Sequence, residues 1–299
     1  MDLVPIPAGV LLRGSTTEQL DRLDAEQHLS RVWFEDETPT ATIEVAPFAI
    51  GRYPVTNRQY AEFATVTGYV TEAERRGFGL VYGAEFWEER PGASWRYPAG
   101  AAEPRWRWYE VPDHPAIHLC AADADAYARW AHLRLPTETE WEYAARGPSS
   151  FRTWPWGDRW NPDACNCAEH WNDASPITDA ASWRQWWSTH RIRHRAPTTT
   201  PVGSHPDGVS PFGVMDLAGS VLEWTGSLYR PYQPDHSYGA IYDQIRERYR
   251  TARGGSWMHY RYQCRTGERF AGDQRYSSVQ TGFRCAGSFV PSERIGFGS

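Results

Sequence analysis

Cysteine and histidine provide the side chains of this sequence that are best suited to metal or redox chemistry. The cysteines are Cys120, Cys165, Cys167, Cys264 and Cys285. Their odd number and their spacing fit no disulfide framework, so we expect free thiols and a cytoplasmic, reducing compartment. Cys165 and Cys167 form a C-x-C pattern, which alone is a weak metal signal, and we interpret both as buried thiols.

Two pairs of histidines have the i, i+4 spacing that places both imidazoles on one helical face. The pairs are His114 with His118, and His190 with His194. Pro115 interrupts the first pair, so we expect His114 to make structural hydrogen bonds in a turn. Three arginines lie beside the second pair and oppose a bound cation. We therefore interpret the second pair as a solvated, basic helix end.

Aromatic side chains are unusually frequent, with 16 Trp, 16 Tyr and 11 Phe among 299 residues. Six Trp lie within residues 156–187, and residues 95–109 hold three more, interleaved with three arginines. Trp beside Arg can form a stacking surface for a planar or peptide ligand. We favour the simpler interpretation, in which the rings fill the core of a loop-rich fold.

The overall charge excludes some classes of partner. There are 31 basic and 37 acidic residues, which gives a formal net charge of −6. This balance does not support a nucleic-acid partner held by a general basic field. No run of 18 apolar residues predicts a membrane span, and the start of the sequence lacks the basic region of a signal peptide. We expect neither a nucleic-acid nor a membrane partner.

The elements that must position these side chains are a few helices among short strands and loops. Helices are predicted at residues 58–67, at 121–131 and after the capping box formed by Thr137 and Glu140. Strands are predicted at residues 1–14, 40–50, 221–225, 251–257 and 282–285. Long loops are expected at residues 76–112 and 148–215. Because no repeat or linker divides the chain, we expect one domain over residues 1–299.

Ten segments, taken in order along the chain, carry a family resemblance. They are Pro7–Gly9, Tyr53–Asn57, Thr67–Glu74, Pro91–Arg96, Asp113–Pro115, Arg134–Gly147, Pro155–Asp158, Leu217–Trp224, Arg253–Trp257 and Gly282–Arg284. Together they resemble the formylglycine-generating enzyme, or sulfatase-modifying factor, family. The resemblance implies an α+β fold: a single loop-rich domain with a C-type-lectin-like core and little regular secondary structure.

The segment that follows Arg253–Trp257 decides between activities within this family. The family's copper oxidases carry two cysteines there, five residues apart. Here the second is Cys264, whereas the first is His259. Thiolates select Cu(I), and imidazole also suits copper or iron. Three interpretations of His259 and Cys264 stay open. They form a remodelled copper or iron site, or they line a polar substrate pocket without metal, or they have only a structural role on a loop that has lost its catalytic function.

The resemblance also implies structural calcium. The residues that match the family's first site are Asp216, Gly219, Val221 and Glu223, with the glycine and the valine acting through their carbonyls. Calcium prefers several hard oxygen ligands, which two carboxylates and two carbonyls would supply. A second site would use Asn166 and the carbonyl of Cys167, with Asp179 as a further partner.

The function implied by the resemblance is a metal-dependent oxidoreductase that uses O2 on a peptide or small natural product, without the usual activation of sulfatases. The candidate catalytic residues are His259, Cys264, Ser256, Trp257 and Arg269. The first two would hold or tune the metal, the next two would shape the pocket floor, and Arg269 with Arg253 would orient an anionic group.

The alternative function is a non-catalytic, C-type-lectin-like module that binds a ligand or a protein. Some relatives diversify the segment between the Arg253–Trp257 and Gly282–Arg284 motifs for binding. In this sequence, residues 258–281 are rich in Tyr, Arg, Ser and Asp. That composition suits a recognition surface.

Overall fold

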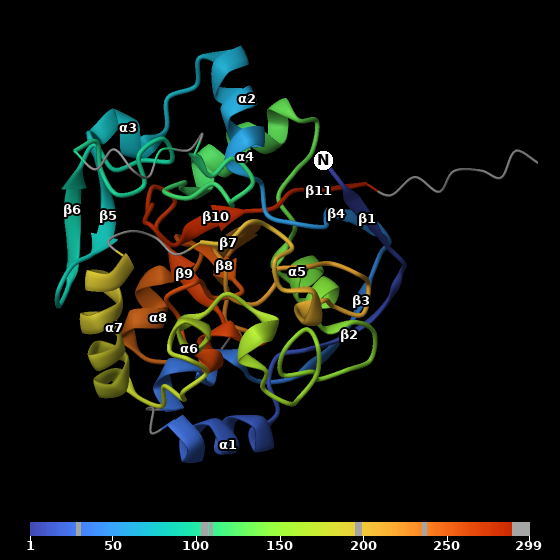
Figure 1. Cartoon of the computed structure of the whole chain (residues 1–299). Helices are drawn as coiled ribbons and strands as arrows, with labels where there is room; N and C mark the ends of the chain where they lie inside the picture. The colour runs from blue at the N-terminus through green and yellow to red at the C-terminus, as the bar shows by residue number, and fades with distance from the viewer. Residues whose placement is uncertain (28–30, 103–106, 108–109, 195–198, 235–237, 289–299) are drawn as a thin grey trace, which may run out of the picture.

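A four-stranded sheet forms the centre of the molecule in the computed structural model (Figure 1). The structure describes residues 1–27, 31–102, 107, 110–194, 199–234 and 238–288. The strand order is β10 (Thr281–Phe283), β7 (Leu222–Leu228), β8 (Arg250–Arg253) and β9 (Phe270–Gly272). β10 is parallel to β7, and the other neighbours are antiparallel. β8 and β9 thereby bracket the segment that contains His259 and Cys264.

A second sheet joins the two ends of the described chain. Its strands are β1 (Leu3–Ile6), β4 (Phe48–Gly51) and β11 (Ala286–Ser288), all antiparallel. Two ribbons complete the strands: β2 (Gly9–Arg13) with β3 (Ala41–Val45), and β5 (Phe78–Tyr82) with β6 (Trp87–Pro91). This mixture of short strands and helices confirms the α+β prediction.

The helices surround the sheets, with α2 and α4 above the central sheet and α1 below it in Figure 1. They are α1 (Thr17–Gln27), α2 (Asn57–Thr67), α3 (Glu72–Arg76), α4 (Ala121–Trp130), α5 (Glu138–Arg146), α6 (Ala168–Trp171), α7 (Ala180–His194) and α8 (Ala240–Ile245). No helix in the described ranges is long and apolar enough to cross a membrane.

Local signals account for the helices that were predicted. Thr56 begins α2 with a capping box, and Gly68 ends it at φ +67°. Thr137 begins α5 with a second capping box. The apolar face of α2 buries Tyr60, whose ring packs on that of Phe283 in β10 at 6.3 Å between centroids. Burial of a ring of this size contributes about 2 kcal/mol or more.

The loops expected at residues 76–112 and 148–215 contain regular structure, so those two predictions were wrong in part. β5 and β6 form a hairpin whose second strand is entirely exposed and therefore lacks apolar alternation. Of α7, only the helix end at His190 and His194 was expected, and the rest was missed because its buried side is made of Trp rather than aliphatic residues. Trp183 and Trp187 on α7 pack on Tyr82 at 5.0 and 5.8 Å between centroids, as expected for rings that fill a core.

Candidate active site

A cavity of about 570 Å³ opens beside β9 and the turn that follows β8, and we call it the His259 cavity. Its walls are mainly aromatic and include Tyr242, Tyr262, Phe270 and Tyr276. Its polar side chains include His259, Gln263, Glu268 and Gln280. A largely apolar cavity of this size with a few convergent polar groups is the usual form of a small-molecule or peptide site.

Two consecutive glycines bring His259 to the cavity. Gly254 and Gly255 have φ values of +95° and +70°, a region that favours glycine. A Cβ on Gly255 would lie 2.6 Å from the carbonyl oxygen of Gln263 and 3.0 Å from the sulfur of Cys264. The chain can therefore leave β8, turn sharply, and return as the 3-10 helix Arg261–Cys264. The amide of Ala168 donates to the carbonyl of His259 and fixes the turn from outside.

The imidazole of His259 is held in its neutral form. Burial lowers the pKa of His259 to about 4. Its Nδ1 atom is buried and has no hydrogen-bond partner among the described residues. A neutral imidazole with a free nitrogen can accept a proton or bind a metal ion.

The pKa of Glu268, in the same cavity, is shifted in the opposite direction from that of His259. Burial raises the pKa of the Glu268 carboxyl well above its usual range, although Arg265 lies 3.1 Å away and opposes that shift. The cavity thus combines a neutral base with a carboxyl group that favours its protonated form. Pairs of titratable groups shifted in this way can divide the roles of base and acid.

Arg269 and Arg253, predicted to orient an anion, are occupied by internal ion pairs. Arg269 Nε and Nη2 donate to Glu138 at 2.8 and 3.0 Å, and Nη1 donates to the carbonyl of Asp36. Arg253 is fully buried and donates to Glu138 and Glu142 at 2.8 and 3.0 Å. Arg269 therefore lines the His259 cavity as predicted, but its guanidinium is held by internal partners, whereas Arg253 does not line the cavity.

Cys264 is not among the residues that line the His259 cavity, and it packs with two other cysteines. Cys165, Cys167 and Cys264 form one buried cluster with Ala218. The Cys165 thiol interacts with both neighbouring thiols, and burial raises its pKa well above the ordinary value. All five cysteines are free and buried, which confirms that interpretation for the C-x-C pair.

The described residues do not complete a redox-metal site around His259. No group of three or more His, Cys, Asp or Glu side chains in the described ranges is arranged to hold a metal ion. Burial is the cause of the lowered pKa of His259. Cys264, the other predicted metal ligand, packs in the thiol cluster. Copper or iron at this pair stays a prediction, and we route no chemical step through it.

Ser256 and Trp257 lie behind the cavity surface. Ser256 is fully buried, and its hydroxyl donates to the amide oxygen of Gln280 at 3.3 Å. Trp257 donates to the carbonyl of Val279 and lines a separate cavity of about 280 Å³ with Trp187. Ser256 therefore supports a cavity residue, and Trp257 belongs to the core below α7.

The arrangement around Glu223 does not fit a calcium ligand. Glu223 is 1% exposed and binds Arg284 through both oxygens, at 2.6 and 2.7 Å. Trp141 Nε1 also donates to it at 2.8 Å. A cation beside this guanidinium would be repelled. Calcium at Asp216 with the carbonyls of Gly219 and Val221 stays a prediction, and Asp216 already accepts the Gly203 amide at 2.7 Å.

The second predicted calcium set is similarly occupied. Asn166 Oδ1 accepts a hydrogen bond from Trp171 at 2.7 Å, and the Cys167 carbonyl accepts the Trp171 amide at 3.4 Å. Asp179 Oδ1 accepts the amide of Ser182 at the start of α7. These contacts engage one oxygen of each of the three residues, and calcium here also stays a prediction.

Each of the described histidines of the two i, i+4 pairs has its own partner in the fold. His114 bonds Thr199 Oγ1 at 2.9 Å, as expected for a structural turn residue. His118 is fully buried and bonds the carbonyl of Pro98. His190 is 3% exposed and stacks on Trp186 at 4.6 Å, so the solvated helix end was wrong for this residue. The side chain of His194 lies outside the described residues.

Glu268 and Gln280 were missed from the sequence. Both lie in the segment between two recognisable motifs, but nothing in their types or spacing distinguishes them from the neighbouring polar residues. Only their shared place in one cavity reveals them.

The fold and the cavity together define the class of protein. The Sulfatase-modifying factor enzyme 1-like domain model matches residues 1–289. The chain therefore belongs to the formylglycine-generating enzyme (sulfatase-modifying factor) family, and the resemblance is confirmed.

Particular relatives place it within that family. It is 35% identical to a formylglycine-generating enzyme of Streptomyces coelicolor, over 84% of this chain and 82% of that one. It is 32% identical to the inactive C-alpha-formylglycine-generating enzyme 2 of Mus musculus, over 96% and 85%. Its fold resembles that of PvdO from Pseudomonas aeruginosa, with a TM-score of 0.61, 22% identity and coverage of 96% and 94%. Both active and inactive relatives thus share this architecture.

Proposed function

We propose that this protein is an oxidoreductase that acts on a peptide or a small natural product bound in the His259 cavity, with O2 as the electron acceptor. The observation that carries the proposal is a largely aromatic cavity of about 570 Å³ that is lined by both His259, whose buried Nδ1 has no partner among the described residues, and the Glu268 carboxyl, whose pKa is raised by burial. Enzymes among its relatives support an enzymatic role.

The chain's own residues supply proton transfer. Oxidation of an amine to an imine removes two electrons and two protons, which reduce O2 to hydrogen peroxide. His259, neutral because its pKa is about 4, accepts the proton that leaves the substrate nitrogen. His259 passes this first proton on to the peroxide. Glu268, whose pKa is raised by burial, donates the second proton that the peroxide needs, and the proton lost from the substrate carbon then restores the Glu268 carboxyl. A thiol substrate would lose its S–H proton to the same imidazole.

The experiment measures O2 uptake and peroxide formation with a panel of thiol- and amine-bearing peptides and small molecules. We expect His259→Ala and Glu268→Gln each to reduce kcat by about 100-fold or more, as for loss of a general base or acid. Glu62→Gln, an exposed carboxylate on α2, is the matched control and should leave the rate unchanged. Elemental analysis of the same preparation tests for copper or iron. Equal rates for all four proteins would contradict the assigned roles.

The second candidate function is a non-catalytic binding module. The observation in its favour is the extent of similarity to the relative named inactive, which covers 96% of this chain. Under this alternative, a ligand found by the same panel would bind the His259 cavity without any consumption of O2. His259→Ala would then change affinity and no rate. The two functions therefore differ in turnover and can be separated in one set of measurements.

A further inference from the structure

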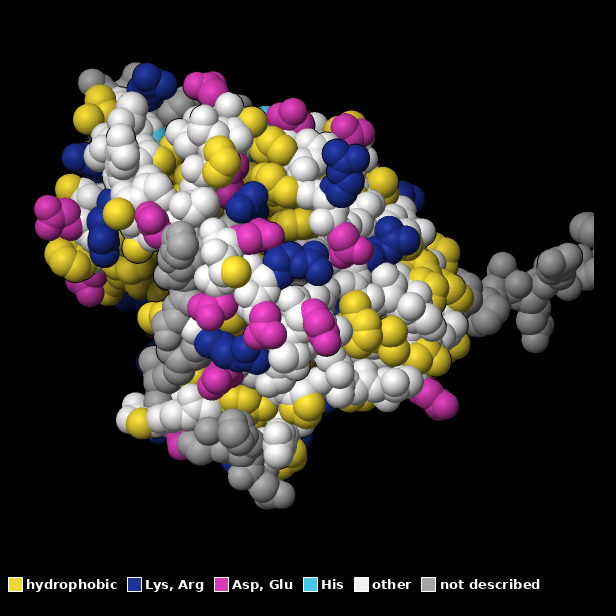
Figure 2. Space-filling model, turned by 90° about the horizontal axis from the view of Figure 1, so that it is seen from below, with side chains coloured by type: hydrophobic (Ala, Val, Ile, Leu, Met, Phe, Trp, Pro, Cys, Tyr) yellow, Lys and Arg dark blue, Asp and Glu magenta, His cyan; other side chains and the backbone are white. Residues whose placement is uncertain are grey.

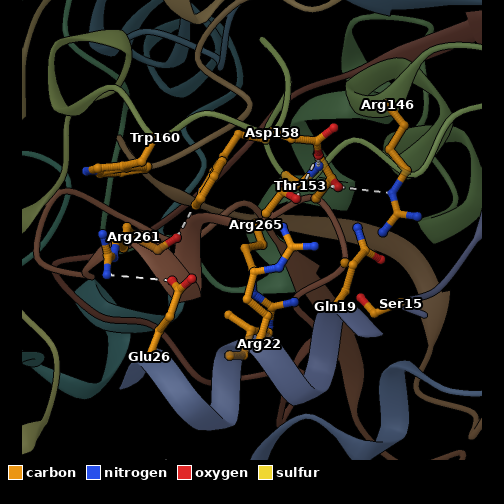
Figure 3. Close-up of a pocket in the computed structure, with 14 residues that line it drawn as sticks. Ser15, Gln19, Arg22, Glu26, Arg146, Thr153, Asp158, Trp160, Arg261 and Arg265 are labelled. Carbon is orange, nitrogen blue, oxygen red and sulfur yellow. Dashed lines mark hydrogen bonds and ion pairs between the residues drawn. The ribbon is translucent and has the colours of Figure 1, made fainter. Parts of the chain in front are cut away.

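A further pocket shares no lining residue with the His259 cavity. It has a volume of about 230 Å³ and is enclosed by α1, residues 153–160 and residues 261–267 (Figure 3). We call it the α1 pocket. We propose that the α1 pocket binds a small organic anion that carries an aromatic ring.

The floor of the α1 pocket holds a buried positive charge. Arg146 is 1% exposed, and its Nε and Nη1 donate to the Thr266 hydroxyl and to two backbone carbonyls. Its Nη2 is directed toward Gly267, where a Cβ would lie 3.0 Å from that nitrogen, 2.5 Å from Ser15 Oγ and 2.7 Å from Glu37 Oε2. Glu142 approaches the guanidinium at Nε, 3.3 Å away. One charged donor is therefore left for a ligand, and a carboxylate is its natural acceptor.

The mouth of the α1 pocket adds further positive charge. Arg22, which is exposed on α1, has no ion pair or hydrogen bond in the described part of the chain. Arg261 lies 3.8 Å from Glu26, which is at the limit of an ion pair. Asp158 accepts hydrogen bonds from the amide and hydroxyl of Thr153. In Figure 3 these side chains surround one hollow.

The arginines of the α1 pocket are largely paired, so directed donors rather than an excess of positive charge would hold an anion there. Four arginines and two acidic residues line the pocket: Arg22, Arg146, Arg261, Arg265, Glu26 and Asp158. Arg265 is neutralised by Glu37, which it contacts at 2.6 and 2.8 Å. Arg146 pairs with the buried Glu142 at 3.3 Å, whereas Arg22 has no ion pair in the described part of the chain. Basic and acidic side chains are interspersed over the surrounding face (Figure 2). Selectivity for an anion must therefore come from the pocket itself rather than from a basic surface.

One wall of the α1 pocket is apolar and rigid. Trp154 and Trp160 lie with their ring centroids 5.1 Å apart, and Leu23 faces them from α1. The indole nitrogen of Trp154 donates to the carbonyl of Arg261 at 3.0 Å, which fixes that ring. A planar ring can pack on this wall while its carboxylate reaches Arg146. The volume admits a ligand with one ring.

The test uses benzoate as the probe and benzamide, its neutral analogue of the same shape, as the control. Ligand-observed NMR titration of the full chain should show saturable binding of benzoate, and at least tenfold weaker binding of benzamide. Absence of benzoate binding, or equal binding of both compounds, would overturn the proposal.

Variants locate the binding. Arg22→Gln should weaken benzoate binding about three- to fivefold, as expected for loss of one exposed charge contact. Asp158→Asn keeps an acceptor for Thr153 and should strengthen binding by a similar factor. Arg184→Gln, which removes an exposed arginine from α7, is the control and should change nothing. If Arg22→Gln and Arg184→Gln have the same effect, benzoate responds to net charge and the α1 pocket is not its site.

Discussion

Replacement of Glu223 by Gln tests the assignment of this residue to an ion pair. Both oxygens of Glu223 contact Arg284, and neither partner is more than 1% exposed. Gln keeps one acceptor oxygen but removes the counter-charge. The other acceptors of Arg284 are the carbonyls of Gly51, Arg52 and Met215, which are neutral. We therefore expect a loss of about 3–5 kcal/mol in the free energy of unfolding, as for a buried charge left unpaired.

A surface pair of the same geometry provides the control. Arg134 contacts Glu140 at 2.6 and 2.7 Å, but its side chain is 44% exposed. Glu140→Gln keeps the capping box with Thr137, because an amide oxygen can still accept the Thr137 amide. Water screens the remaining charge, so we expect a loss below about 1 kcal/mol.

Urea unfolding of wild type and both variants supplies the comparison. Each protein is measured with calcium and with excess chelator. An ion pair predicts the same loss for Glu223→Gln in both conditions, whereas a calcium ligand predicts a loss that appears only with calcium. A loss of less than about 1 kcal/mol for Glu223→Gln would refute the reasoning from burial. Addition of Arg284→Met to Glu223→Gln should restore part of the stability, because it removes the stranded charge.

Three further predictions follow from the site. The lowered pKa of His259, about 4, means that the unfolded chain binds a proton more readily; stability should fall as pH decreases from about 6.5 toward 4. His259→Gln should reduce that fall in thermal unfolding measurements. A thiol reagent should modify the native protein slowly and all five cysteines after denaturation, because all are buried. Copper-loaded protein should not convert the cysteine of a C-x-P-x-R peptide to formylglycine, as followed by mass, since His259 replaces one thiolate; rapid conversion would show that imidazole suffices.

Features with a local cause could be predicted from the sequence. Thr56 and Thr137 begin helices because their hydroxyls cap backbone amides within three residues. Gly68 ends α2 because it can adopt a positive φ. The order of the motifs along the chain indicated the family, which the family model confirms. His259 follows the Arg253–Trp257 motif, and it lines a cavity with polar and aromatic walls.

Features that depend on distant partners could not be predicted. The hairpin of β5 and β6 and the helix α7 become stable through rings that meet across the fold, such as Tyr82 and Trp187. Arg269 has the residue type of an anion-binding group, yet Glu138, 131 residues away, occupies it. Spacing along the chain contains no information on such pairings.

The sequence by itself determined which side chains are available and roughly where along the scaffold they occur. The tertiary structure alone decided their chemical state. Cys264 became a member of a thiol cluster with Cys165 and Cys167, and Glu268, which lines the same cavity as His259, became a carboxyl whose pKa is raised by burial. The physical reason is that burial and neighbouring charge set the pKa and the partners of a side chain, and both are produced by segments that meet only when the whole chain has folded.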